Sequence, residues 1–140
     1  MTLSANELAV EIERLFTALV REGGRLGFSE RDALTSTQRA ALIAIADGGP
    51  LRLGGVADAL GTTDATATRT VQSLERLGLV ARTPDTGDRR GIRVAATAEG
   101  RKVIARGRRR LAAAVANVIP GGDHERLASL LRDLTGAVAR

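Results

Sequence analysis

The sequence predicts a mainly α-helical protein that carries one small β-hairpin. Apolar residues recur at helical spacing over most of the 140 residues, and clusters of Gly and Pro separate the helical segments. One pair of short segments instead alternates apolar and polar residues on either side of a turn at 84–88. Because a chain of this length can bury its own core, we expect residues 1–140 to form a single domain.

The composition excludes several classes of functional site. The chain contains no Cys and a single histidine, His124, so it offers no disulfide, no Cys-ligated zinc and no redox-active thiol. Phe16 and Phe28 are its two aromatic residues, which argues against a protein that stacks single-stranded bases on aromatic rings. We therefore expect no metal ion and no cofactor.

Positive charge is concentrated in the middle of the chain. The formal net charge is +5, but residues 48–110 hold thirteen basic against six acidic side chains, whereas residues 1–47 hold five basic against seven acidic. A focused basic region indicates a polyanionic partner such as nucleic acid. An arginine excess that serves only solubility is the alternative that charge alone leaves open.

Two helices are predicted before the basic region. Apolar residues at helical spacing from Leu8 to Leu19 predict a helix over 4–25. A second helix is predicted over 37–47, with N-cap candidates just before it and a Gly-Gly-Pro sequence that stops it. Residues 51–53 are short and extended, and form a candidate strand.

The next two helices form a recognisable pair. A short helix is predicted over 54–60, and Gly61 suits its C-terminal cap. Thr63 then caps a helix over 64–77, in which Asp64 suits the positive end of the helix dipole. Two short helices joined by a tight turn that contains glycine make a helix-turn-helix unit.

The two faces of the helix over 64–77 differ in chemistry. At about 100° per residue, the packed stripe holds Ala67, Val71, Leu74 and Gly78. The opposite face holds Ala65, Arg69, Gln72 and Arg76, flanked by Thr68 and Ser73. Arg pairs with guanine, Gln with adenine, and short hydroxyls with base or phosphate, so this face predicts a helix that reads the major groove of DNA.

A hairpin follows, with strands expected over 79–83 and 91–96. Its second strand places three apolar side chains on one face, and the turn chemistry comes from Pro84, Asp85 and Gly87. Asp88 is expected to pair with Arg90 across the base of the loop, which leaves Arg89 free to project. A charged loop that contacts only solvent is the alternative.

Two further helices are predicted at the C-terminal end. Thr97 caps a helix over 98–118 whose first half is basic, and Asp123 caps a last helix with a leucine-rich stripe. The apolar stripes of the first and last helices lie outside the helix-turn-helix segment, so we expect a second copy of the chain to cover them. A twofold dimer would also place two recognition helices about 34–36 Å apart, which is one turn of DNA. A closed six-helix monomer is the alternative.

Five short motifs stand in a specific order between residues 34 and 100. They are Leu34-Thr-x-x-Gln38, Val56-Ala-Asp-Ala-Leu-Gly61, Thr68-Arg69-x-Val71-x-x-Leu74-Glu75-x-x-Gly78-Leu79-Val80-x-Arg82, Asp88-Arg89-Arg90 and Val94-x-x-Thr97-x-x-Gly100. In this order the motifs resemble the MarR family of bacterial transcription regulators, and the flanking helices fit the layout of that family.

The resemblance implies a winged helix-turn-helix over about 34–100, dimerisation helices over about 4–25 and 98–138, and an obligate homodimer. It implies a repressor that binds a double-stranded DNA operator and is released by a small-molecule effector. Carried over by position, five residues of the recognition helix face the major groove, two arginines lie near phosphates, Arg89 forms the wing tip, and Asp88 with Arg90 braces it. The candidate DNA-binding residues, with the helix cap included, are Thr63, Thr66, Thr68, Arg69, Gln72, Ser73, Arg76, Arg82, Asp88, Arg89 and Arg90.

Other functions explain the sequence less well. An architectural DNA-binding protein without sequence preference could use the basic run over 101–110, and it stays open as the alternative. We expect no enzyme, because the chain has one His, no Gly-rich phosphate loop and no paired carboxylates on one face. A protein–protein adaptor would leave Arg69, Gln72 and Arg89 without a role. With no apolar run of about 18–20 residues and no secretory signal, we expect a cytoplasmic protein that does not bind membranes.

Overall fold

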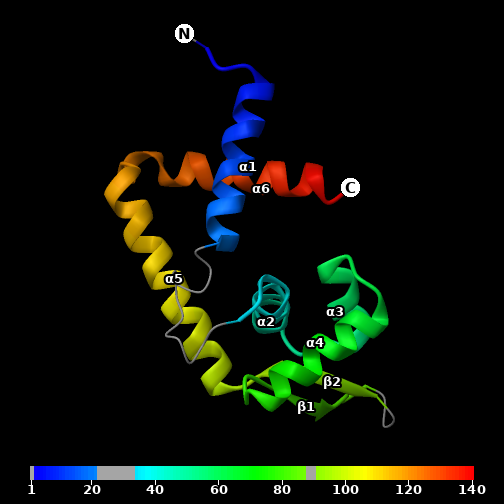
Figure 1. The fold of residues 1–140 in the computed structure, drawn as a ribbon. Helices are drawn as coiled ribbons and strands as arrows, with labels where there is room; N and C mark the ends of the chain where they lie inside the picture. The colour runs from blue at the N-terminus through cyan, green and yellow to red at the C-terminus, as the bar shows by residue number, and fades with distance from the viewer. Residues whose placement is uncertain (1, 22–33, 88–90) are drawn as a thin grey trace.

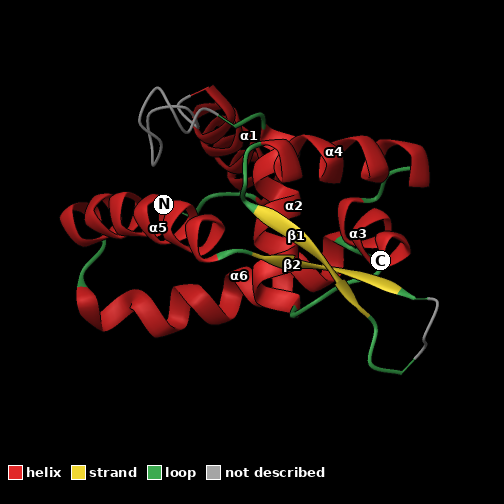
Figure 2. Cartoon of the chain, turned by 90° about the horizontal axis from the view of Figure 1, so that it is seen from below, coloured by secondary structure: helices red, strands yellow, loops and turns green. Residues whose placement is uncertain are grey.

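The computed structural model describes residues 2–21, 34–87 and 91–140. Figures 1 and 2 show a mostly helical chain with one two-stranded antiparallel sheet, as the sequence predicts. In order, the elements are α1 (Ala5–Arg21), α2 (Ser36–Gly48), α3 (Leu53–Leu60), α4 (Asp64–Arg76), β1 (Val80–Pro84), β2 (Ile92–Ala96), α5 (Ala98–Val118), the 3₁₀ turn η2 (Gly121–Asp123) and α6 (His124–Val138). Among the helices described, none is both long enough and apolar enough to cross a membrane.

The hydrophobic core lies where α2, α3 and α4 pack on the hairpin and on the first turns of α5. Leu42 and Ile45 of α2, Leu74 of α4, Val94 of β2 and Val103 of α5 are all fully buried. This unit fills the lower half of Figure 1. It confirms the expected helix-turn-helix with an attached hairpin.

The helix α2 begins with a capping box. The Thr35 hydroxyl accepts a hydrogen bond from the backbone N–H of Gln38 at 3.1 Å, and the Gln38 side-chain oxygen accepts one from the N–H of Thr35 at 2.9 Å. These reciprocal bonds satisfy donors that the first turn of a helix otherwise leaves open. The predicted N-cap region and the stop at the following glycines are both confirmed.

The turn of the helix-turn-helix forms as the sequence predicts, with one correction. Gly61 adopts φ 62° and caps α3, and the Thr63 hydroxyl accepts from the N–H of Thr66 to cap α4. Gly78 does not belong to the packed stripe of α4, however. The helix ends at Arg76, and Gly78 is exposed with φ 74°, a left-handed conformation that turns the chain into β1.

The strands of the hairpin differ by one residue from the expected bounds. Its strands begin one residue later than predicted, and Pro84 is the last residue of β1 rather than part of the turn, paired with Ile92. Of the candidate strand over 51–53, Leu51 alone pairs with the hairpin; it exchanges two backbone hydrogen bonds with Val94, at 2.7 and 3.0 Å. The strand stops there because Leu53 already begins α3.

The start of α5 packs against the turn between α4 and β1. The Thr97 hydroxyl caps α5 by accepting from the N–H of Gly100, and it donates to the carbonyl of Gly78 at 2.7 Å. Gly100 is buried, and a Cβ built there would lie 2.1 Å from the carbonyl oxygen of Leu79. The close approach of the two backbones therefore requires glycine at this position.

The terminal helices lie apart from this core. Figure 1 shows α5 running from the winged unit to the opposite end of the molecule, where α6 follows. Neither α1 nor α6 buries a residue, and both expose large apolar side chains. Asp123 precedes α6 but makes no side-chain cap bond, which corrects its expected role; its backbone is helical because it ends the turn η2.

Candidate nucleic-acid interface

Three long polar side chains cover the outer face of α4. Arg69, Gln72 and Arg76 are all exposed, and each makes no hydrogen bond or ion pair with any described residue. The opposite side of the helix is held by Val71 and Leu74, both fully buried. The fold therefore presents two guanidinium groups and one amide from a rigid helix, with their hydrogen-bonding groups available to a ligand.

The hydroxyl groups of α4 are divided between packing and the surface. Thr63 and Thr66 bond to each other at the helix start, and Thr68 is partly exposed. The Ser73 hydroxyl donates to the carbonyl of Thr70 at 2.7 Å and accepts from the Gln38 side-chain amide at 3.0 Å. Because both bonds are internal, Ser73 joins α2 to α4 in this structure, a role that the sequence pattern of α4 alone did not indicate.

Arg82 lies beside the outer face of α4, on β1. Its Nε donates to the Glu75 carboxylate at 3.0 Å, and both side chains are about one-third exposed. An ion pair at this exposure is worth little in stability, but it holds the guanidinium near the C-terminal end of α4. Arg82 thus lies next to the exposed face of α4, and its expected place near phosphates stays a prediction.

The predicted wing tip lies outside the described residues. The residues concerned are Asp88, Arg89 and Arg90, and their roles remain predictions.

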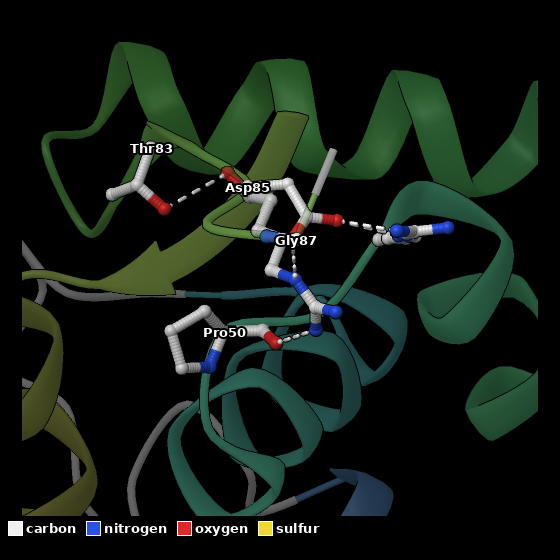
Figure 3. Close-up of polar contacts among 6 residues, drawn as sticks. Pro50, Thr83, Asp85 and Gly87 are labelled. Atoms are coloured by element: carbon white, nitrogen blue, oxygen red, sulfur yellow. Dashed lines mark hydrogen bonds and ion pairs between the residues drawn. The ribbon is translucent and has the colours of Figure 1, made fainter. Parts of the chain in front are cut away.

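At the base of the wing lies a polar cluster that the sequence analysis missed. The Asp85 side chain is 2% exposed, and Figure 3 shows its carboxylate among the surrounding polar contacts. Arg52 donates to one carboxylate oxygen, with its Nε at 2.8 Å. The other oxygen accepts from the N–H of Gly87 at 3.0 Å and lies 3.2 Å from Nε of Arg93.

These contacts lower the pKa of Asp85 to about 2. The backbone N–H of Gly87 contributes most, followed by the hydrogen bonds from Arg52, and both effects exceed the opposing effect of burial. The spacing Asp-Thr-Gly is a turn pattern, which is why Asp85 was expected only to shape the turn. Its arginine partners were not recognisable, because Arg52 is 33 residues away in the chain.

Some arginines of the basic run over 101–110, which lies in α5, form ion pairs within the protein. Arg108 pairs with Asp47 of α2 at 2.8 Å, and Arg106 lies 3.7 Å from Glu99. The first pair connects α5 to α2, and the second lies within α5. Arg101, Lys102 and Arg109 are exposed on the same helix.

Comparison with known proteins identifies the winged unit. Residues 34–91 match the model of the MarR family. This segment has the sequence features of MarR-family transcriptional regulators. The matched segment runs from just before α2 to the residue before β2, so it contains the helix-turn-helix and the first strand of the wing. Its helix α4 carries the exposed groups described above.

Solved structures share the fold over nearly the whole chain. A MarR-like transcriptional regulator from Thermotoga maritima is 26% identical, with 99% of each chain covered and a TM-score of 0.66. FabT from Streptococcus pneumoniae, solved in complex with DNA, is 22% identical over 96% of this chain and 95% of its own, with a TM-score of 0.74. BpsR from Bordetella bronchiseptica, whose DNA binding is regulated by 6-hydroxynicotinic acid, is 21% identical over 92% and 98%, with a TM-score of 0.66. No curated protein sequence matches the chain.

Proposed function

We propose that this protein is a MarR-family regulator that binds a pseudo-palindromic operator as a homodimer and represses transcription there, in the cytoplasm. The observation that carries the proposal is the outer face of α4, where Arg69, Gln72 and Arg76 are exposed and unengaged among the described residues. Arg and Gln are the side chains that read guanine and adenine edges in the major groove. The complex of FabT with DNA supports the same use of this fold.

A homodimer is supported by the terminal helices. Phe16 of α1 is 66% exposed, and Leu130, Leu131 and Val138 of α6 are 57%, 52% and 78% exposed. Apolar stripes of this size are normally buried, and a second copy of the chain offers the matching stripes. In this arrangement residues 1–140 act as one unit, with the winged helix-turn-helix over about 34–100 and dimerisation helices on both sides.

A small-molecule effector has a plausible place between these two parts. A cavity of about 100 Å³ lies where α1, α2 and α5 meet, lined by apolar Leu19, Ile43, Ile104 and Leu111 and by two cations, Arg39 and Arg108. Arg39 is partly buried, and desolvation lowers its pKa. An apolar molecule with a negative charge fits such a lining, and the regulation of BpsR by 6-hydroxynicotinic acid supports this class of effector.

Such an effector would act by changing the spacing of the two α4 helices. Arg108 both lines the cavity and pairs with Asp47 of α2, so a ligand there touches the contact between α5 and the winged unit. The effector then weakens DNA binding only to the extent that it binds one spacing of the α4 helices more tightly than the other.

Binding to DNA over a salt series tests the proposal. The purified protein is titrated against the duplex upstream of its own coding sequence and against a random duplex of equal length. A preference of at least about 1,000-fold, with a footprint over a palindrome, is the expected result. Equal affinity for both duplexes with a steep salt dependence would instead establish the architectural alternative, in which the exposed cations of α5 carry the binding.

A further inference from the structure

The cluster of Asp85, Arg52 and Arg93 joins the wing to the helix-turn-helix. Arg52, which donates to Asp85, is the residue immediately before α3 and occupies its N-cap position. Arg93, the second partner, lies on β2 and donates through Nη1 to the carbonyl oxygen of Pro50 at 3.0 Å. Figure 3 shows the contacts of the Asp85 carboxylate and, next to them, the contact to the Pro50 carbonyl.

The cluster adds to the backbone contact beside it. Leu51 and Val94 already exchange two backbone hydrogen bonds, so residues 50–52 are joined to the hairpin by backbone and side chains together. The buried side chains of the hairpin, Val80, Val94 and Ala96, lie toward the end away from the turn. The Asp85 ion pairs lie nearer the turn, and they fix the orientation of that outer part of the hairpin.

We propose that Asp85 is a positioning residue that sets the angle of the wing relative to α3 and α4, and that DNA affinity depends on it although it does not touch DNA. The inference rests on the proposed function. Asp85 is buried and negatively charged, so direct contact with a phosphate would be unfavourable. Its effect on DNA affinity is therefore indirect, because it fixes the orientation of the wing.

Removal of the Asp85 charge separates this role from simple electrostatics, because the two predict opposite changes in DNA affinity. Asp85→Asn removes one negative charge from a DNA-binding surface, and long-range attraction to phosphates alone would make binding tighter. Loss of the fixed wing angle would make binding weaker. The two effects thus oppose each other, and the measured direction decides between them.

The first experiment compares operator binding by the wild type, Asp85→Asn and a matched control, Glu75→Gln. Glu75 also pairs with an arginine of the hairpin, but it is 30% exposed and lies on α4 itself. We expect Asp85→Asn to bind about tenfold more weakly, which is the size of one lost groove contact, and Glu75→Gln to bind at least as tightly as the wild type. Unchanged or tighter binding by Asp85→Asn would overturn the proposal.

Amide hydrogen exchange gives a local readout that a general loss of stability would not mimic. In Asp85→Asn the amides of Leu51 and Val94, which bond across the junction, should exchange faster, whereas the amide of Thr97, which bonds to Leu79 at the α5 junction, should be unchanged. Equal acceleration at all three amides means global destabilisation and counts against a positioning role.

Arg52→Gln keeps the test decisive if Asp85→Asn folds poorly. The Arg52 side chain is 56% exposed. In Arg52→Gln the buried Asp85 carboxylate still has Arg93 as a partner, so no buried charge is left unpaired. Positioning predicts that Arg52→Gln weakens operator binding and that the double variant is no weaker than Asp85→Asn alone. Additive losses would show instead that Arg52 contacts phosphate by itself.

The same data separate this inference from the proposed function. If the wild type shows no preference for its upstream duplex, the proposed function fails, while exchange at Leu51 and Val94 still decides whether Asp85 fixes the wing. If the wild type binds specifically and Asp85→Asn binds equally well, only the positioning role is overturned.

Discussion

Glu75 and Arg82 form an ion pair of 3.0 Å that joins the helix α4 to the first strand of the wing. The pair lies at the edge of the surface that carries the exposed cations of α4. The Glu75 carboxylate offsets the positive charge that Arg82 would otherwise present to phosphates.

Glu75→Gln should therefore raise DNA affinity slightly while hardly changing stability. The pair is about one-third exposed, and pairs of this kind contribute about 0–1 kcal/mol to the free energy of unfolding. Urea unfolding and duplex binding at low and high salt measure the two effects. A marked fall in affinity would show that Glu75 orients Arg82 toward a phosphate, so that the ion pair itself is required.

Arg69→Ala should weaken binding to the operator by about 1–3 kcal/mol and relax the choice of base at one position. Arg69 projects from the middle of the exposed face of α4, so its loss removes a base contact without disturbing the core. Arg109→Ala, an exposed cation of α5, is the matched control and should leave specificity intact. The reverse pattern would favour the architectural alternative.

Gly100→Ala should destabilise the fold by about 2–3 kcal/mol. The added methyl group would lie 2.1 Å from the carbonyl oxygen of Leu79 and 3.2 Å from Cδ1 of Leu42, so α5 must shift away from the turn after α4. Gly54→Ala in α3 is the control, since nothing lies within 4 Å of its added Cβ. Thermal unfolding of both variants checks this, and equal melting temperatures would contradict the close approach at Gly100.

Leu130→Glu should convert a dimer into a monomer without unfolding the winged unit. Leu130 is 57% exposed in the single chain, so the charge costs little there, but it would be buried without a partner in a dimer interface. Ser129→Glu, on the opposite face of α6, is the control. Light scattering after gel filtration gives the mass, and a dimer that survives Leu130→Glu would place the interface elsewhere.

The contribution of Asp85 to stability should depend on pH. Its pKa in the folded protein is about 2, below the usual value of about 3.9 in an unfolded chain, so its stabilising effect is present above pH 4 and is lost as the pH falls toward 2. The difference in unfolding free energy between the wild type and Asp85→Asn should therefore shrink over this range. A difference that stays constant down to pH 2 would mean that the carboxylate is not stabilised by its partners.

The sequence predicted the elements well because their signals are local. The caps at Thr63 and Thr97, the left-handed Gly61 and the full extent of α5 depend on residues within one or two turns, and all are confirmed. The alternation of β2 correctly placed Val94 in the core. The outer face of α4 followed from helical periodicity in the same way.

Other features of the site depend on segments that are distant in the chain. Ser73 lies on the face expected to meet DNA, but its hydroxyl bonds to Gln38 of α2, 35 residues away. Gly78 has the right spacing for the packed stripe, but the helix ends before it because the chain must turn into β1 beneath α5. No local pattern reveals such partners, since helical spacing describes one element at a time.

By itself, the sequence determined the helices, their caps, the hairpin and the side chains that α4 presents, since each follows from backbone preferences and hydrophobic periodicity over a few residues. Only the tertiary structure decided which polar groups are used inside the protein. Asp85 shows the difference most clearly. As part of a local turn it is an ordinary surface residue, but folding brings Arg52 and Arg93 to its carboxylate and removes it from water. Burial and long-range ion pairing exist only in the folded chain. Through them Asp85, a turn residue, attaches the wing to the helix-turn-helix.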